Sequence, residues 1–209
     1  MIANCFPLLH EYIQDLQSEK EQIPTPRRET LQQLAAHIRQ RLTNEGEVRL
    51  NFICTHNSRR SHLAQIWAAT AAAWYGLERV RTYSGGTEAT AFNPRAVAAL
   101  QRAGFRIESP GGDNPRYQVS FAENGPVLHC FSKVFDHPEN PRTDFAAIMT
   151  CSEADENCPF IPGATFRLPL TYADPKEADG TPAETSRYDE RVRQIGRELF
   201  FAFQLINHD

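Results

Sequence analysis

Hydrophobic positions divide the chain into a helical N-terminal part and a longer part in which strands and helices alternate. In the first part, apolar residues recur every three or four positions, which is the spacing of one face of a helix. Pro24 and Pro26 separate two such runs, and Gly46 ends the second. We therefore expect residues 1–46 to form a helical extension packed on a domain that covers residues 47–209.

The remainder of the chain alternates between short apolar runs and amphipathic segments. The apolar runs, which are typical of buried strands, are Leu50–Cys54, Val80–Ser84, Phe145–Thr150 and Thr165–Leu170. The helical segments are Ser61–Tyr75, Asn93–Ala103 and Ser186–Ile206. This alternation predicts a three-layer α/β domain around a parallel sheet of about four strands, flavodoxin-like in general plan.

Residues 108–144 interrupt the alternation. Two runs with alternating apolar residues, Tyr117–Phe121 and Val127–Phe131, flank the turn-forming residues Glu123–Pro126. This pattern predicts a β-hairpin inserted into the domain. Gly85-Gly86, which follows the second predicted strand, is expected to form a turn.

Composition and charge restrict the possible partners. The chain has 209 residues, of which 23% are charged, and its formal net charge is -4. A mildly acidic protein has no overall attraction to nucleic acid or to an anionic membrane, so any anion site must be local. No apolar run is long enough to cross a bilayer, and the N-terminus lacks the pattern of a secretory signal. We therefore expect a cytoplasmic protein with reduced thiols.

The segment Cys54–Ser61, Cys-Thr-His-Asn-Ser-Arg-Arg-Ser, carries the clearest chemistry. It joins a predicted strand to a predicted helix, where backbone N–H groups and the helix N-terminus favour a bound anion. Arg60 can donate two hydrogen bonds to a tetrahedral oxyanion, and the same positive field stabilises a Cys54 thiolate. We expect Ser61 to donate to the sulfur and Asn57 to brace the loop by bonding to its backbone.

The loop resembles the phosphate-binding loop shared by low-molecular-weight protein tyrosine phosphatases and thioredoxin-coupled arsenate reductases. Its Thr-His-Asn-Ser portion is more similar to the reductase form, and Tyr83–Thr87 and Asn93–Ala96 resemble the family's next strand and helix. The resemblance extends from about Leu50 to Phe203. It implies that Cys54 is the nucleophile and that Arg60 binds the oxyanion. We predict that the oxyanion-binding residues are Thr55, His56, Asn57, Ser58, Arg59, Arg60 and Ser61.

Two loop positions have side chains whose role we predict separately. Arg59 replaces a residue that is commonly Cys or small in the family, and we expect a solvated charge at the rim of the loop. His56 is expected to brace the loop by hydrogen bonding rather than to act as an acid or a base.

Cys151 and Cys158 follow the third predicted strand, with six residues between them and Pro159 after them. Structural zinc needs four ligands, usually in close pairs, and no matching Cys or His pair lies nearby, so we predict no metal. A redox pair is a better interpretation, in which the polar spacer forms a short helix that loosens before the sulfurs meet. Two cysteines of a core loop are the alternative. Cys5 and Cys130 are expected to be structural.

This segment also resembles the redox segment of thioredoxin-coupled arsenate reductases. The resemblance implies that Cys54 forms an adduct with arsenate, that Cys151 attacks Cys54 and releases arsenite, and that Cys158 then attacks Cys151. Thioredoxin would reduce the final disulfide. Asp174, within Thr171–Pro175, matches the family's general acid, and an Asp-Pro turn is its alternative role.

We therefore predict a thioredoxin-coupled arsenate reductase that needs no cofactor and has arsenate or phosphate as its ligand. The alternative is a low-molecular-weight-type protein tyrosine phosphatase, which forms a cysteinyl-phosphate on phosphotyrosine or small phosphate esters. Lys176 and Glu177, where such phosphatases often have aromatic residues, weigh against it. A non-catalytic oxyanion binder or redox sensor is disfavoured because Cys54, Arg60 and Asp174 occur together.

Overall fold

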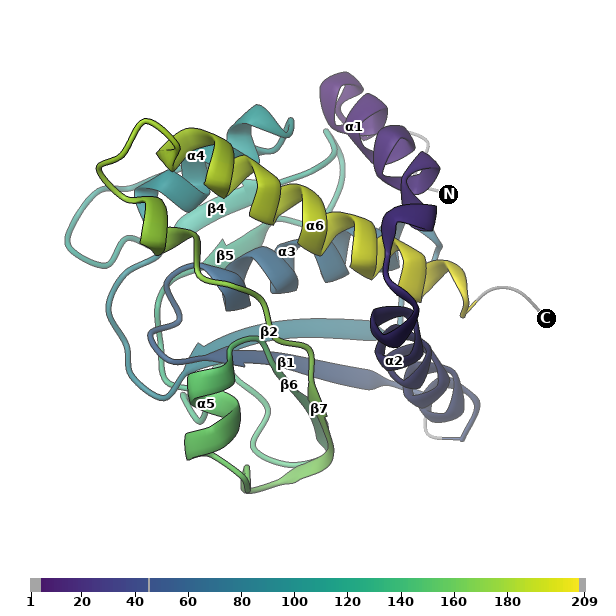
Figure 1. Ribbon diagram of the computed structural model, residues 1–209. Helices are drawn as coiled ribbons and strands as arrows, with labels where there is room; N and C mark the ends of the chain where they lie inside the picture. The colour runs from purple at the N-terminus through teal and green to yellow at the C-terminus, as the bar shows by residue number, and fades with distance from the viewer. Residues whose placement is uncertain (1–4, 45, 207–209) are drawn as a thin grey trace.

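The computed structural model describes residues 5–44 and 46–206. A four-stranded parallel sheet with the strand order β2-β1-β6-β7 lies at its centre (Figure 1). The strands are β1 Val48–Cys54, β2 Val80–Gly86, β6 Phe145–Met149 and β7 Ala164–Pro169. The parallel sheet predicted from the apolar runs is confirmed.

Helices and loops cover both faces of this sheet, which gives the predicted three layers. Helices α3 and α6 lie over one face, whereas the short helix α5 lies on the other (Figure 1). The α-helices are α1 Pro7–Ser18, α2 Thr25–Asn44, α3 Arg60–Trp74, α4 Pro94–Arg102, α5 Ser152–Asn157 and α6 Glu184–Gln204. Two short 3-10 helices, η1 Lys20–Gln22 and η2 Pro175–Ala178, complete the helical elements. None of the helices in these described ranges is long and apolar enough to span a membrane.

The two faces of the sheet enclose two separate hydrophobic clusters. Successive strand residues point to opposite faces, so Phe52 of β1 and Ile148 of β6 belong to the main core under α3 and α6. Ile53 and Met149 belong to a smaller cluster on the other face, beneath α5. The smaller cluster is important for function because it contains the residue that ends β1, Cys54.

Helices α1 and α2 are the helical extension expected at the N-terminus. Their apolar stripes do not form a core of their own, because Leu9 and Leu34 are fully buried in the same cluster as Trp67 of α3. Burial of an amphipathic face, rather than intrinsic helix propensity, is what usually holds such helices in place.

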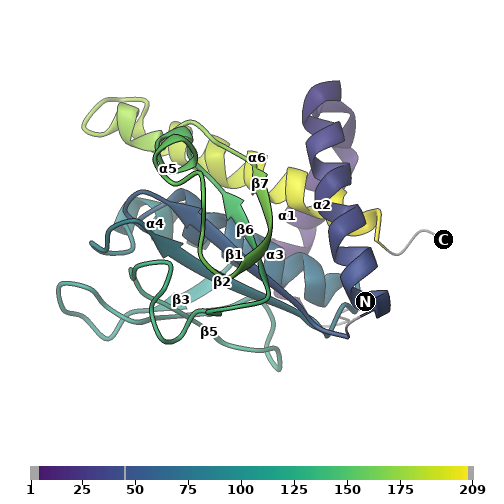
Figure 2. The ribbon, with the colours of Figure 1, turned by 90° about the horizontal axis from the view of Figure 1, so that it is seen from below.

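The insertion contains the predicted hairpin, and a short strand at its start extends the same small sheet. Strands β4 Tyr117–Ser120 and β5 Leu128–Cys130 pair antiparallel, and β3 Arg106–Glu108 adds to β4. Figure 2 shows this small sheet beside the β2 edge of the central sheet. The sequence did not reveal β3, since three residues are too few to show an alternating pattern.

Gly85-Gly86 does not form the expected turn, because both residues belong to the end of β2. A side chain would not fit at either position. A Cβ on Gly85 would lie 2.3 Å from the Cα atom of Phe135, and one on Gly86 would lie 2.6 Å from the carbonyl oxygen of Thr55. The glycines thus let the end of β2 pack directly against the loop that follows β1.

Candidate active site

The loop Cys54–Ser61 lies where β1 ends and α3 begins, at the carboxyl edge of the parallel sheet. Ligands of open α/β sheets bind at this edge, and the N-terminus of a following helix favours an anion there. A narrow pocket opens at the loop. It is lined by Cys54, His56, Ser58, Arg59, Arg60 and Asp174.

Cys54 is 3% exposed, and its sulfur lies 3.1 Å from the hydroxyl oxygen of Ser61. The Nδ2 of Asn57 donates to that same hydroxyl oxygen at 2.8 Å. The Ser61 hydroxyl is therefore held beside the sulfur, in the position from which the sequence predicts it to donate.

Asn57 braces the loop, but not through the loop's own backbone as predicted. It adopts a left-handed conformation with φ 44, which asparagine tolerates better than most residues. Its Oδ1 accepts a hydrogen bond from the backbone N–H of Lys133 at 2.9 Å. The side chain therefore connects the loop to the segment after β5, a contact that depends on the folded insertion.

His56 also differs from its prediction. Its side chain is 45% exposed, with Nε2 3.7 Å from Glu88 Oε2 at the surface. The bracing comes from the backbone instead, because the His56 carbonyl accepts hydrogen bonds from the hydroxyls of Ser132 at 3.0 Å and Thr90 at 3.2 Å. Ser58 is held similarly, its hydroxyl donating to the Ala91 carbonyl at 2.7 Å.

Arg60 and Asp174 meet at the pocket. One terminal nitrogen of Arg60 donates to the Tyr172 carbonyl at 3.1 Å, and the other donates to Asp174 Oδ2 at 2.8 Å. Asp174 Oδ1 accepts from the backbone N–H of Lys176 at 3.0 Å, which caps η2. Asp174 thus has both properties considered for it: it starts a turn, and its carboxylate lines the pocket.

Arg59 is not the solvated charge predicted for the rim. Its side chain is only 12% exposed, and its Nε donates to the hydroxyl of Tyr188 at 3.0 Å. Tyr188 lies on α6, far along the chain from the loop. Nothing in the local sequence indicates this contact, because it depends on how α6 packs beside α3.

The three cysteines singled out in the sequence come together on one side of the sheet. Cys54 and Cys151 are buried in the smaller hydrophobic cluster, and Cys158 is half-buried against it. The residues between Cys151 and Cys158 form helix α5, as expected for the spacer. Cys5 and Cys130 lie elsewhere, on the N-terminal segment and on β5.

Cys151 lies at the N-terminus of α5, and its sulfur accepts a hydrogen bond from the backbone N–H of Ala154 at 3.4 Å. The same sulfur lies 3.4 Å from Thr55 Oγ1. Since Thr55 donates its own proton to Glu153 Oε2 at 3.1 Å, its oxygen is left to accept the thiol proton of Cys151. The residue after Cys54 therefore connects the oxyanion loop directly to the second cysteine.

Two buried titratable side chains lie behind the loop. Burial lowers the pKa of His62 well below its usual value, and the ring packs on Phe92 with Nδ1 3.2 Å from Ser84 Oγ. Burial also lowers the pKa of Lys133, whose ammonium group lies over the ring of Phe131. His62 is therefore neutral near pH 7 and supports α3 without adding charge to the site.

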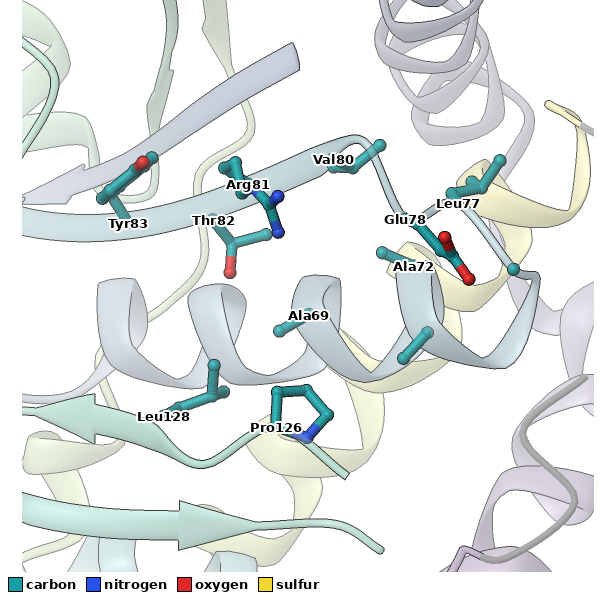
Figure 3. Close-up of a pocket in the computed structure, with 12 residues that line it drawn as sticks. Ala69, Ala72, Leu77, Glu78, Val80, Arg81, Thr82, Tyr83, Pro126 and Leu128 are labelled. Carbon is teal, nitrogen blue, oxygen red and sulfur yellow. The ribbon is translucent and has the colours of Figure 1, made fainter. Parts of the chain in front are cut away.

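Another pocket lies away from this chemistry. It has a volume of about 570 Å³ and is bounded by the second half of α3, the first half of β2 and the approach to β5 (Figure 3). Ala69, Val80 and Leu128 are among its mainly apolar lining residues. Because β1 and β2 run parallel from Val48 and Val80, this pocket is at the opposite end of the strands from Cys54.

No cluster of metal ligands accompanies the loop. Within residues 5–44 and 46–206, no group of three or more His, Cys, Asp or Glu side chains is arranged to hold a metal ion. The pocket itself is lined by a thiol, an imidazole, a hydroxyl, two guanidinium groups and a carboxylate, next to the backbone N–H groups of the loop.

Known proteins share this sequence and fold. A family model described as low molecular weight phosphotyrosine protein phosphatase matches residues 49–119. Arsenate reductase of Bacillus licheniformis is 31% identical over 149 residues, which cover 71% of this chain and 89% of that protein. Arsenate reductase of Bacillus subtilis is 30% identical over the same shares of both chains.

Solved structures support the fold. A crystal structure of a YwlE mutant from Bacillus subtilis matches with a TM-score of 0.51 at 15% identity, covering 78% of this chain and all 100% of that one. The crystal structure of YfkJ from Bacillus subtilis matches with a TM-score of 0.50, also at 15% identity, over 79% of this chain and 99% of the other. At such identities the similarity concerns the fold alone. With its loop, its fold and its curated relatives, the chain belongs to the family of low-molecular-weight phosphotyrosine phosphatases and the arsenate reductases related to them.

Proposed function

We propose that this protein is an arsenate reductase that uses Cys54, Cys151 and Cys158 in turn. The observation that carries the proposal is that these three thiols share one apolar cluster beside the oxyanion loop, graded from buried to half-buried. A phosphatase of this family needs only Cys54, whereas sequential thiol–disulfide exchange needs all three. The curated relatives named arsenate reductase support the same choice.

Binding of arsenate in the pocket is the first step. The backbone N–H groups of residues 55–61 and the guanidinium of Arg60 donate to its oxygens, while Ser61 stabilises the Cys54 thiolate. The thiolate attacks arsenic, so a sulfur–arsenic bond forms and one arsenic–oxygen bond breaks. Asp174 protonates the departing oxygen, which leaves as water.

Reduction of arsenic is the second step. Cys151 loses its proton and attacks the sulfur of Cys54. A disulfide forms, the sulfur–arsenic bond breaks, and its electron pair stays with arsenic, which leaves as arsenite in the +3 state. Thr55 and Glu153, which form a hydrogen-bonded chain from the Cys151 sulfur, offer a path for the proton.

Regeneration of Cys54 completes the cycle. Cys158 attacks Cys151, which releases the Cys54 thiolate and leaves a Cys151–Cys158 disulfide. Helix α5 must unwind for this step, because Cys151 and Cys158 flank its two ends. At the helical rise per residue, seven positions along the chain separate two Cα atoms by about 10 Å, whereas a disulfide bridges about 7 Å or less. A dithiol protein of the thioredoxin type supplies the two electrons that reopen this disulfide. We also propose a cytoplasmic location, where such thiols stay reduced.

The test is arsenate-dependent oxidation of NADPH by the purified protein with thioredoxin and thioredoxin reductase. We expect steady turnover, and we expect the Cys158→Ser variant to lose it. In that variant no thiol at position 158 can attack Cys151 and release Cys54 from the Cys54–Cys151 disulfide. Cys5→Ser is the matched control: its half-buried thiol donates to the Phe121 carbonyl, away from the oxyanion loop, so turnover should persist.

Two other outcomes would oppose the proposal. Absence of arsenate-dependent oxidation, together with hydrolysis of an aryl phosphate that Asp174→Asn slows strongly and Cys151→Ser does not, would identify a phosphatase. Binding of phosphate in a calorimetric titration, with no product from either substrate, would identify a non-catalytic oxyanion binder.

A further inference from the structure

Arg59 shares the pocket with Cys54 but is held from outside the loop. Its Nε donates to the hydroxyl of Tyr188 at 3.0 Å, and that hydroxyl donates in turn to Asp179 Oδ1 at 2.9 Å. Tyr188 is itself 1% exposed, so it cannot swing away easily. The guanidinium group of Arg59 is therefore fixed at the pocket by α6 and by the segment that follows η2.

The terminal nitrogens of Arg59 remain able to donate. One lies 3.8 Å from Asp174 Oδ1 and the other 3.9 Å from Asp179 Oδ2, which are ion-pair distances longer than a direct hydrogen bond. Arg60 differs, because both of its terminal nitrogens already make hydrogen bonds, to Tyr172 and Asp174. The pocket thus contains a second guanidinium group with uncommitted donors, next to the carboxylate of Asp174.

We propose that Arg59 makes the site selective for free tetrahedral oxyanions over organic phosphate esters. This inference shares one premise with the proposed function, namely that the pocket beside Cys54 binds the oxyanion. It adds that the substrate of this pocket is an inorganic oxyanion.

The reason lies in the oxygen that points away from Cys54. In free arsenate or phosphate this oxygen is charged or carries only a proton, and it can accept a hydrogen bond from Arg59. In an ester the same oxygen carries an organic group. That group would lie among Arg59, Asp174 and Asp179 and would remove water from these charges without replacing the lost hydrogen bonds.

The lining of the pocket offers an organic group nothing in return. Its residues are a thiol, an imidazole, a hydroxyl, two guanidinium groups and a carboxylate, and none of them is a large apolar side chain. Recognition of an aryl ester normally uses an apolar or aromatic surface. A free oxyanion therefore gains a charged hydrogen bond from Arg59, whereas the organic group of an ester removes water from the charged side chains and forms no hydrogen bond in its place.

The experiment compares the binding of inorganic phosphate and phenyl phosphate by calorimetric titration. Both are measured on full-length protein that carries Cys54→Ser, so that no turnover occurs, with and without Arg59→Ala. We expect the added Arg59→Ala change to weaken the binding of inorganic phosphate by about tenfold or more, as for loss of a hydrogen bond between charged groups. We expect phenyl phosphate to bind unchanged or more tightly.

Three further variants make the result specific. Arg95→Ala removes another guanidinium that faces Asp179, at 3.9 Å, but does not line the pocket, so it should leave the preference unchanged. Arg59→Lys keeps the charge but not the planar group. Its preference for inorganic phosphate over phenyl phosphate should lie between that of the protein with Arg59 and that of Arg59→Ala. Tyr188→Phe keeps Arg59 but releases it, and should reduce the preference partly even if Arg59→Ala does not fold.

This inference would be overturned if Arg59→Ala weakened the binding of both ligands equally, or if the preference for inorganic phosphate over phenyl phosphate stayed the same. The titration needs no arsenate reduction, so the two proposals fail separately. A lost preference in a protein that does not reduce arsenate would leave Arg59 as the selective residue and remove only the reductase assignment.

Discussion

A chain of hydrogen bonds runs from the backbone of Lys133 through Asn57 and Ser61 to the sulfur of Cys54. Every member of this chain is buried. Buried polar networks of this kind hold one geometry, because any unmade bond leaves a polar group without water. The side chain of Asn57, which bonds to Ser61 and to the Lys133 N–H, thus positions the proposed nucleophile.

Replacing Asn57 should loosen the nucleophile and destabilise the protein. Asn57→Gly loses both side-chain hydrogen bonds and should lower the free energy of unfolding by about 2 kcal/mol. Asn57→Ala should cost roughly 1 kcal/mol more, because alanine is strained at positive φ. Urea unfolding monitored by circular dichroism would measure both.

A phosphate-dependent measurement separates the loop from overall stability. Phosphate should raise the midpoint of unfolding of the natural protein, and it should raise the midpoint of the Asn57 variants less at the same phosphate concentration. An equal rise of the midpoint in all three proteins would mean that Asn57 does not organise the anion site.

Helix α5 is the element whose opening the proposed cycle requires, and Arg167 holds it closed. From β7, one terminal nitrogen of Arg167 donates to the carbonyls of Asp155 at 2.7 Å and Cys158 at 3.2 Å. It also lies 2.6 Å from the Asp155 carboxylate. These contacts stabilise the helical, reduced form, in which the two sulfurs are apart.

Arg167→Ala should therefore favour the Cys151–Cys158 disulfide. We expect a reduction potential more negative by about 30–60 mV, the equivalent of losing about 1.4–3 kcal/mol from the reduced form. Equilibration in redox buffers of known ratio, followed by thiol labelling, would measure it. Arg187→Ala is the control, since its pair with Glu190 lies on the exposed surface of α6. A potential that moves equally in both variants would refute the role of Arg167.

At the scale of the whole molecule, the N-terminal helices and the sheet share one hydrophobic core. Leu34 of α2 is fully buried in the same cluster as Trp67 of α3, while Leu8 of α1 is 56% exposed. Helices that share a core are expected to unfold together with the rest of a small domain.

Leu34→Ala should lower the stability of the entire protein by about 2–5 kcal/mol, because it leaves a cavity in the shared core. Leu8→Ala should change stability by about 0.5 kcal/mol or less, as is usual for exposed positions. We expect one transition in thermal unfolding, with the same midpoint by far-ultraviolet circular dichroism and tryptophan fluorescence. A separate early transition in the Leu34→Ala variant would show that α1 and α2 are an independent unit.

Much of the architecture could be predicted from local patterns. Apolar runs of strand length gave the four parallel strands, and the Asn93-Pro94 pair marked the start of α4, where the Asn93 side chain accepts from the Arg95 N–H. The expectation for Gly85-Gly86 was wrong because a glycine pair indicates a turn and a close approach equally well. Only the neighbouring chain, here Phe135 and Thr55, decides between them.

By itself, the sequence determined the chemistry available to this protein. Cys54, Arg60 and Ser61 belong to one short strand–loop–helix segment, so their mutual geometry follows from short-range backbone structure. Tertiary structure decided how that chemistry is surrounded. Tyr188 reaches Arg59 from 129 residues away, and Thr55 meets Cys151 across 96 residues. Such contacts depend on how helices and strands pack through the whole core, and no local pattern of residues contains that information.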